Sequence, residues 1–256
     1  TKTKDFLDAG RWVLFTGTPC QIAGLKSYLG REYNNLFTVD LICHGVPSPA
    51  LWQKYINYRE EKAGSKTRRI AFRRKDEGWK LFSLSFKYQN DKEYIQTLKK
   101  DLYMRAFLKD ICLRPSCYDC QYKSLNRQSE ITLADFWGIQ KILPEMDDDK
   151  GTSLIFVNSE KGSAMLKEIK DNIYYKEVYI KDAVRYNSAA FKSAKYNQHR
   201  DGFFGDLYRL SFDQLVKKYC SDPLLIRIKV KIKSIIRTLL KEPGLLTRIK
   251  SRKTPG

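Results

Sequence analysis

The segment 11–49 constrains the fold most, because it contains the same local pattern twice. In each copy an apolar run is followed by a turn, a hydroxyl residue, a proline and an amphipathic helical pattern. Thr18-Pro19 and Ser48-Pro49 suit the start of a helix, because the hydroxyl accepts a free N–H and proline has no N–H to leave unpaired. Alternating strands and helices predict an α/β fold with parallel strands and right-handed crossovers. The two apolar runs are Trp12–Phe15 and Leu36–Cys43.

Beyond this segment the patterns give the fold α+β character. The runs 70–73 and 81–88 flank a polar loop, and the second alternates between apolar and polar residues, which predicts an inserted antiparallel strand pair. A short third strand is expected at 94–98. Further strands are expected at 131–136, 154–157 and 174–180. Helices are expected at 50–62, 102–108 and 163–170. Two more are expected, one capped by Asp182 and one beginning at Ser211.

The charge and the cysteine content narrow the functional classes. The chain carries 48 basic and 29 acidic residues, a net charge of +19. This charge favours an anionic partner, such as a nucleotide cofactor, nucleic acid, an acidic protein or a lipid surface. No run reaches the roughly 18 apolar residues of a membrane span, and no signal-like run is present. Six cysteines are too few for a disulfide scaffold. We therefore expect a cytoplasmic protein that uses cysteine for metal or redox chemistry.

Four of the six cysteines form a candidate site. Cys20 follows the first apolar run and Cys43 ends the second. Both fall at the carboxyl ends of the expected strands, where ligands of parallel sheets bind. Cys117 and Cys120 form a C-x-x-C motif after a proline, with Arg114, Lys123 and Arg127 around it. Four thiolates suit either a cubane iron–sulfur cluster or a closed zinc site. The alternative is that the first two are small core residues and the motif is a plain turn. Cys112 and Cys220 are expected to be bystanders.

The C-terminal end is strongly basic. Residues 224–256 contain ten Lys and Arg residues and one acidic residue, Glu242. Apolar residues recur there at helical spacing, which is typical of a helix lying on an anionic membrane surface. The other interpretation is a helix that packs its apolar stripe on protein while the lysines are solvated. The first interpretation makes the protein cytoplasmic with a peripheral membrane attachment.

Five motifs, in order along the chain, resemble one known family. They are GTPCQIAGLKSYL, VDLICHGVPSP, FRRK with a following GW, LRPSCYDCQYK and ITLADFWGI, and they cover roughly residues 11 to 160. Together they are similar to the C-terminal domain of the beta-subunit family of coenzyme F-420 (deazaflavin) hydrogenases and dehydrogenases. Members of that family are iron–sulfur flavoproteins, and many have a ferredoxin-like module upstream. This chain departs from the family pattern at Arg74 and Ala134, and it has no upstream ferredoxin cysteines.

The resemblance implies an oxidoreductase with two cofactors. A [4Fe-4S] cluster would be held by Cys20, Cys43, Cys117 and Cys120, and electrons would pass between it, FAD and an unknown acceptor. An electron-donor protein or a ferredoxin-like module is the implied partner. Residues 1–205 would form the iron–sulfur and flavin domain, and 206–256 a helical, basic extension. The residues implied near the flavin are Gly17, Thr18, Arg73, Lys75, Asp135, Phe136, Trp137 and Gly138.

Two other hypotheses stay open at the level of sequence. The first is a zinc-stabilised basic module, without redox activity, that binds nucleic acid or an acidic partner. Nucleic acid is disfavoured, because the aromatic residues are not interleaved with the basic ones as in stacking readers of nucleic acid. The second is a scaffold that keeps the fold and has lost its electron-entry module. Metal and flavin content distinguish all three.

Overall fold

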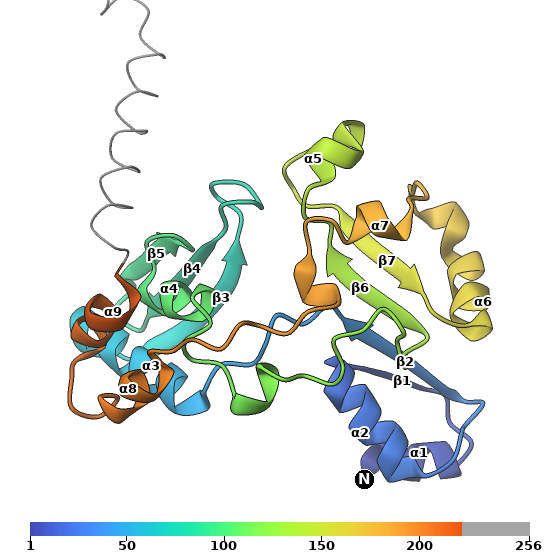
Figure 1. Ribbon diagram of the computed structural model, residues 1–256, viewed down its shortest axis with the longest axis horizontal. Coiled ribbons are helices and arrows are strands. Elements are labelled where there is room, and N and C mark those ends of the chain that lie inside the picture. The colour runs from blue at the N-terminus through green and yellow to red at the C-terminus, as the bar shows by residue number, and fades with distance from the viewer. Residues whose placement is uncertain (222–256) are drawn as a thin grey trace, which may run out of the picture.

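Two β-sheets lie in separate halves of the molecule (Figure 1). The structure is a computed structural model that describes residues 1–221. The larger sheet has the strand order β1-β2-β6-β7. Strands β1, β2 and β6 are parallel, and β7 runs antiparallel to β6. The expected mixed α/β fold with a parallel unit is confirmed. The strands are β1 (Val13–Gly17), β2 (Leu36–Leu41), β6 (Ile131–Asp135) and β7 (Ser153–Val157).

The two proline-capped helices form where the local chemistry predicts them. Helix α2 (Pro19–Leu29) follows the N-cap Thr18, whose backbone N–H donates to Gln21 Oε1 at 2.9 Å. Helix α3 (Pro49–Ala63) follows Ser48. Both helices end at a glycine in the left-handed region, where a residue without Cβ carries no steric penalty. Helix α2 and the N-terminal helix α1 (Lys2–Asp8) share a small core built around Leu7, Leu29 and Leu36.

The smaller sheet is antiparallel, with the order β3-β4-β5. Its strands are β3 (Thr67–Arg74), β4 (Ser83–Tyr88) and β5 (Glu93–Thr97), so the expected strand pair and short third strand are confirmed. Four helices pack with it into the largest apolar core: α3, α4 (Leu102–Leu108), α8 (Arg200–Gly205) and α9 (Phe212–Cys220). The fully buried members of this core include Leu51, Tyr55, Leu84, Phe86, Phe203 and Leu215.

A second core joins the two halves. Trp79, from the loop between β3 and β4, packs with Phe136 and Ile139 after β6. The Arg73 guanidinium on β3 is paired with the carboxylate of Asp135 at the end of β6. The remaining helices border the larger sheet: α5 (Ile139–Ile142), α6 (Glu160–Ile169) and α7 (Ile180–Ala183). Short 3-10 turns occur at Pro115–Cys117, Pro144–Met146, Lys170–Asn172 and Ser188–Ala190.

Two local predictions near residue 180 are wrong. The strand expected at 174–180 is absent: residues 174–179 are irregular and Ile180 begins α7. Tyr174 and Tyr179 are both 77% exposed. The aromatic and β-branched residues of this segment fit a strand, but no neighbouring strand within residues 1–221 pairs with it. Asp182 does not cap a helix. It lies inside α7, whose N-cap is Tyr179, and its carboxylate accepts from Arg185 at 2.6 Å.

The C-terminal prediction is only partly within the described residues. Helix α9 begins after Ser211 as expected. Its buried side chains Phe212, Leu215 and Val216 belong to the core of the smaller sheet. Residues 222–256, with the expected basic helix and membrane contact, lie outside the described residues. The boundary at 205/206 stays a prediction. Within residues 1–221 no helix is long and apolar enough to cross a membrane.

Candidate metal centre at the sheet edge

Four cysteines line one pocket at the carboxyl edge of the parallel strands. Cys20 lies in the first turn of α2, just after β1, and Cys43 follows β2. Cys117 ends the 3-10 turn, and Cys120 follows it three residues later. The pocket is completed by Pro19, Gly45, Val46, Tyr122, Lys123 and Arg127. The structure thus brings together the four cysteines that the sequence indicates. Cys112 and Cys220 are fully buried in the core of the smaller sheet instead.

Backbone pairing between residues 46–48 and 112–114 holds the two halves of the site together. The Arg114 N–H donates to the Val46 carbonyl at 2.8 Å, and the Ser48 N–H donates to the Cys112 carbonyl at 2.9 Å. Gly45 permits this close approach. A Cβ there would lie 2.8 Å from Leu113 Cδ1, and its φ of +156° is one that L side chains rarely adopt. The pairing places the C-x-x-C motif beside the segment that carries Cys43.

Two polar groups contact the sulfur atoms directly. The Val46 N–H donates to Cys117 Sγ at 3.4 Å, and Thr18 Oγ1 lies 3.1 Å from Cys20 Sγ. Cys20 also lies in the first turn of the 11-residue helix α2, whose dipole favours a thiolate there. The Cys120 N–H donates to Ser193 Oγ at 2.9 Å, which fixes the end of the motif. Cys20 and Cys117 therefore have a polar neighbour at sulfur, and Cys120 has a partner at its backbone N–H.

Two cations with little solvent access line the same pocket. The Lys123 ammonium donates to the carbonyl oxygens of Cys43, His44 and Ala189, the last at 3.1 Å. Burial lowers its pKa, and burial also raises the pKa of the Cys43 thiol, against the attraction of Lys123. Arg127 is only 5% exposed, and its Nη1 lies 3.7 Å from Asp40 Oδ2. Its Nη2 is buried and has no hydrogen-bond partner within residues 1–221.

This donor set fits a negatively charged iron–sulfur group. The pocket supplies four sulfur ligands, an N–H donor to one sulfur, and a buried guanidinium nitrogen without a partner in the described chain. Iron–sulfur clusters are held by four thiolates and are modulated by such N–H donors and by nearby charge. In the part of the chain that the structure describes, no three His, Cys, Asp or Glu side chains are close enough to hold a single metal ion.

The residues expected near a flavin fall into three groups. Gly17 and Thr18 lie beside the cysteine pocket, at the turn between β1 and α2. Arg73 and Asp135 are brought together as an ion pair between the two sheets. The others serve packing or loop contacts. The Lys75 ammonium donates to the Lys150 carbonyl, and Phe136 is 3% exposed. The centroid of the Trp137 ring lies 4.8 Å from that of the Trp79 ring. Gly138 has a φ of +89°, and a Cβ there would meet the Tyr186 side chain.

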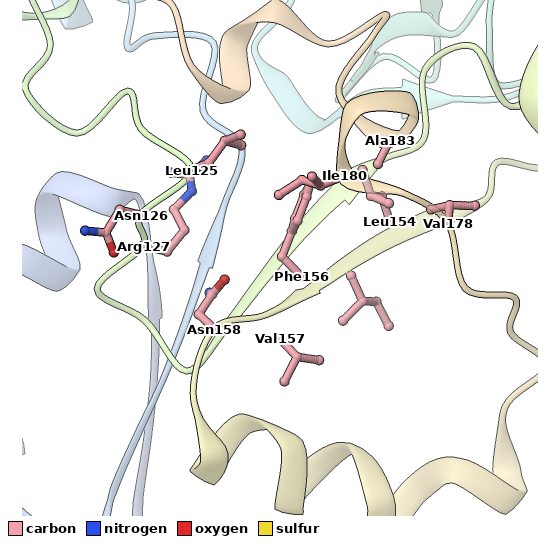
Figure 2. A pocket seen from close by; sticks show the side chains of 11 residues that line it. Leu125, Asn126, Arg127, Leu154, Phe156, Val157, Asn158, Val178, Ile180 and Ala183 are labelled. Atoms are coloured by element: carbon pink, nitrogen blue, oxygen red, sulfur yellow. The ribbon is translucent and has the colours of Figure 1, made fainter.

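A second cavity shares Arg127 with the cysteine pocket, and the residues that line this cavity are drawn in Figure 2. Its volume is ≈ 340 Å³, and it lies over β7 between residues 125–127 and α7. Figure 2 shows Asn126 and Arg127 on one side and Phe156 and Ile180 on the other. Sequence reasoning noted Arg127 only as a basic neighbour of the C-x-x-C motif, and it missed Asp40. The signal for Asp40 was a carboxylate inside an otherwise apolar strand.

Together, the mixed α/β fold and the four-cysteine pocket with its buried cations define a protein with a candidate thiolate metal centre at the edge of its parallel strands. The family model for the C-terminal part of the beta subunit of coenzyme F420 hydrogenase/dehydrogenase matches residues 10–183. The chain belongs to this family, so the resemblance is confirmed. No curated protein matches the chain.

The chain also matches solved structures. One of them belongs to the F420-reducing [NiFe] hydrogenase complex from Methanosarcina barkeri, studied by xenon derivatization. The TM-score is 0.40 at 14% sequence identity, and the match covers 84% of this chain. The chain spans 63% of the length of that hydrogenase chain.

Proposed function

We propose that this chain is an iron–sulfur flavoprotein oxidoreductase or electron-transfer protein. It would pass electrons between a [4Fe-4S] cluster, FAD and an acceptor. The observation that carries the proposal is the convergence of Cys20, Cys43, Cys117 and Cys120 on one pocket from three separate segments. Small core cysteines have no reason to converge in this way, and the two remaining cysteines do not share the pocket.

The family supports a cluster over the zinc-stabilised module, because its members are iron–sulfur flavoproteins. Four thiolates alone suit either group. The orphaned Nη2 of Arg127 suits the net negative charge that four thiolates give to the site. Bound there, a cluster supplies one-electron transfer.

The chain's own residues would hold the cluster and control its surroundings. The Val46 N–H stabilises charge on Cys117 Sγ, to which it donates. The Thr18 hydroxyl lies against Cys20 Sγ and donates to Gln21 Oε1. Lys123 fixes the backbone on either side of Cys43 and adds positive charge to the pocket. Pro19, Val46 and Tyr122 line the pocket beside the cysteines. Cys43, Cys117 and Cys120 are partly buried, whereas Cys20 is exposed.

We propose that FAD binds where the β1–α2 turn approaches the end of β6. The amide groups of Gly17 and Thr18 at the N-terminus of α2 suit a pyrophosphate. Arg73 would supply a guanidinium for it once released from Asp135, and Lys75 a second cation. FAD would pair single electrons from the cluster for two-electron chemistry on the acceptor. The donor would be a protein or module of ferredoxin type.

Metal content tests the cluster assignment. Each of the six cysteines is replaced by alanine, and the anaerobically purified proteins are analysed for iron, sulfide and zinc. We expect a brown wild-type protein that absorbs at about 400 nm, because the charge-transfer absorption of iron–sulfur clusters lies in this region. Removal of any of the four pocket cysteines should abolish the cluster. Cys112→Ala and Cys220→Ala are the controls and should retain it. A colourless zinc protein, or equal iron loss from all six variants, would contradict the assignment.

Flavin binding needs a separate test. The cluster-loaded protein is titrated with FAD, and Arg73→Gln is compared with Arg74→Gln. Arg74 is the matched control, because it is the next residue on β3 and pairs with Asp76 and Glu93 instead. Loss of a charge-assisted hydrogen bond costs about 1.5–3 kcal/mol, so Arg73→Gln should weaken binding at least about tenfold. An intact cluster with no FAD affinity would remove flavin from the proposal.

A further inference from the structure

Arg127 and Asp40 form a buried charge pair that the cysteine motifs do not explain. Asp40 lies near the end of β2, three residues before Cys43, and is 1% exposed. Arg127 lies seven residues after Cys120 and is 5% exposed. Buried charges are costly, and the pair is loose, with 3.7 Å between Nη1 and Oδ2. The other contact of Nη1 is the Tyr122 carbonyl, at 3.5 Å. A pair kept for stability alone would be bonded more fully.

The Arg127 guanidinium has a hydrogen-bond donor without a partner in the described chain, beside the sulfur ligands. Arg127 lines the cysteine pocket, and its buried Nη2 has no partner within the described chain. Asp40 does not line the pocket, so the cation is the nearer charge of the two. At low solvent exposure a charge is poorly screened and acts over several ångströms. The pair therefore exposes the pocket to a net positive field.

We infer that the Arg127–Asp40 pair sets the reduction potential of the cluster, with Arg127 raising it and Asp40 limiting the rise. This inference rests on the proposed function. Reduction adds one negative charge to a group that is already negative, and a fixed cation at the pocket wall favours that added charge. Asp40 lies 3.7 Å from Nη1 and offsets part of the guanidinium charge. Arg127 thus acts on the cluster through its charge, whereas the four cysteines are the ligands.

Substitutions of the two partners test the inference, because charge and structure predict different results. The potential is measured by anaerobic redox titration, with the cluster followed by absorbance and electron paramagnetic resonance. We expect Arg127→Met to make it more negative and Asp40→Asn less negative. Arg127→Lys keeps a cation and should fall between wild type and Arg127→Met. Arg114→Met removes an exposed cation near Cys117 that does not line the pocket, and should leave the potential unchanged.

The outcomes separate this inference from the proposed function. A wild-type protein without a cluster would overturn both. With a cluster present, equal shifts from Arg127→Met and Arg127→Lys would overturn the inference alone. If Arg127→Met fails to fold or to bind the cluster, Arg127→Lys and Asp40→Asn decide. A less negative potential in Asp40→Asn supports the inference, and an unchanged or more negative one overturns it.

Discussion

At the scale of single residues, Lys123 connects three segments through one ammonium group. Its Nζ donates to the carbonyls of Cys43, His44 and Ala189. We expect Lys123→Met to lower the free energy of unfolding by about 1–3 kcal/mol, because carbonyls in a part-buried site lose their donor. Urea denaturation measures the change. Lys99→Met, at an exposed position, is the control, and equal effects of the two substitutions would contradict the bridging role.

Asp8 gives a prediction about pH. Its carboxylate accepts from Lys4, Arg31 and Tyr33, which tie α1 to the approach of β2. The Lys4 hydrogen bond, followed by that of Tyr33, lowers the pKa of Asp8 from 3.8 to about 2. A lowered folded-state pKa means that the stabilisation is complete above 3.8 and is lost as the pH falls through about 2.

The matching measurement is the free energy of unfolding at several pH values within that window. Wild type should lose more stability than Asp8→Asn as the pH falls, because asparagine has no proton to gain. Asp5→Asn, on the same helix, is the control. Parallel curves for wild type and Asp8→Asn would show that the carboxylate has no such role.

Residues differ in how far the sequence predicts their roles. The four cysteines were predictable, because their spacing and their positions after strands are local signals. The Arg127–Asp40 pair was not predictable, because it depends on two segments meeting in space. The same holds for Arg73 and Asp135, whose ion pair joins the two sheets. Spacing in a sequence indicates ligands more readily than it indicates the charges that surround them.

At the scale of elements, two helical glycines should respond in opposite directions to alanine. A Cβ on Gly24 in α2 would contact nothing within 4 Å, whereas a Cβ on Gly162 in α6 would lie 2.2 Å from the Glu130 carbonyl oxygen. Alanine is favoured over glycine in a helix by about 0.8–1 kcal/mol, so Gly24→Ala should stabilise the protein. Gly162→Ala should destabilise it, because α6 must move away from β6.

Thermal denaturation of the two variants checks this contrast. Each substitution adds the same methyl group to a helix, so each serves as the control for the other. Stabilisation by both would mean that α6 can shift away from residue 130 without cost. A higher midpoint for Gly24→Ala and a lower one for Gly162→Ala is the expected result.

Elements with their own start signals were predicted well, and elements defined by neighbours were not. Helices α2 and α3 carry a cap and a proline within two residues. A strand exists only where another strand accepts its hydrogen bonds, and 173–179 has no such partner within residues 1–221 despite its strand-like composition. The sequence also did not predict that β3, β4 and β5 form a sheet of their own. That separation depends on the aromatic core around Trp52 and Tyr55.

At the scale of the whole molecule, helix α9 lies after the domain boundary predicted at 205/206 and packs against the domain before it. Its Phe212, Leu215 and Val216 are almost fully buried in the core of the smaller sheet. Burial of each such side chain contributes about 1.5–3 kcal/mol, against a total stability of about 5–15 kcal/mol for a domain. A chain that ends at Gly205 should therefore lose its cooperative unfolding transition. One that ends at Ser221 should keep it.

Calorimetry of the two truncated chains beside the full chain makes the comparison. If the chain ending at Gly205 unfolds with the same enthalpy and midpoint as the one ending at Ser221, residues 206–221 form a separate unit as the sequence suggested. The longer truncated chain is the control for loss of residues 222–256.

The distribution of the cysteines along the chain has a consequence for biogenesis. Cys43 and Cys117 are separated in sequence by α3, the whole of the smaller sheet and α4. During synthesis the first two ligands emerge well before the last two. The four meet only after residues 46–48 have paired with residues 112–114. Under the proposed function, iron delivery would follow the closure of this long loop, and a metallated chain would be one that has already completed its topology.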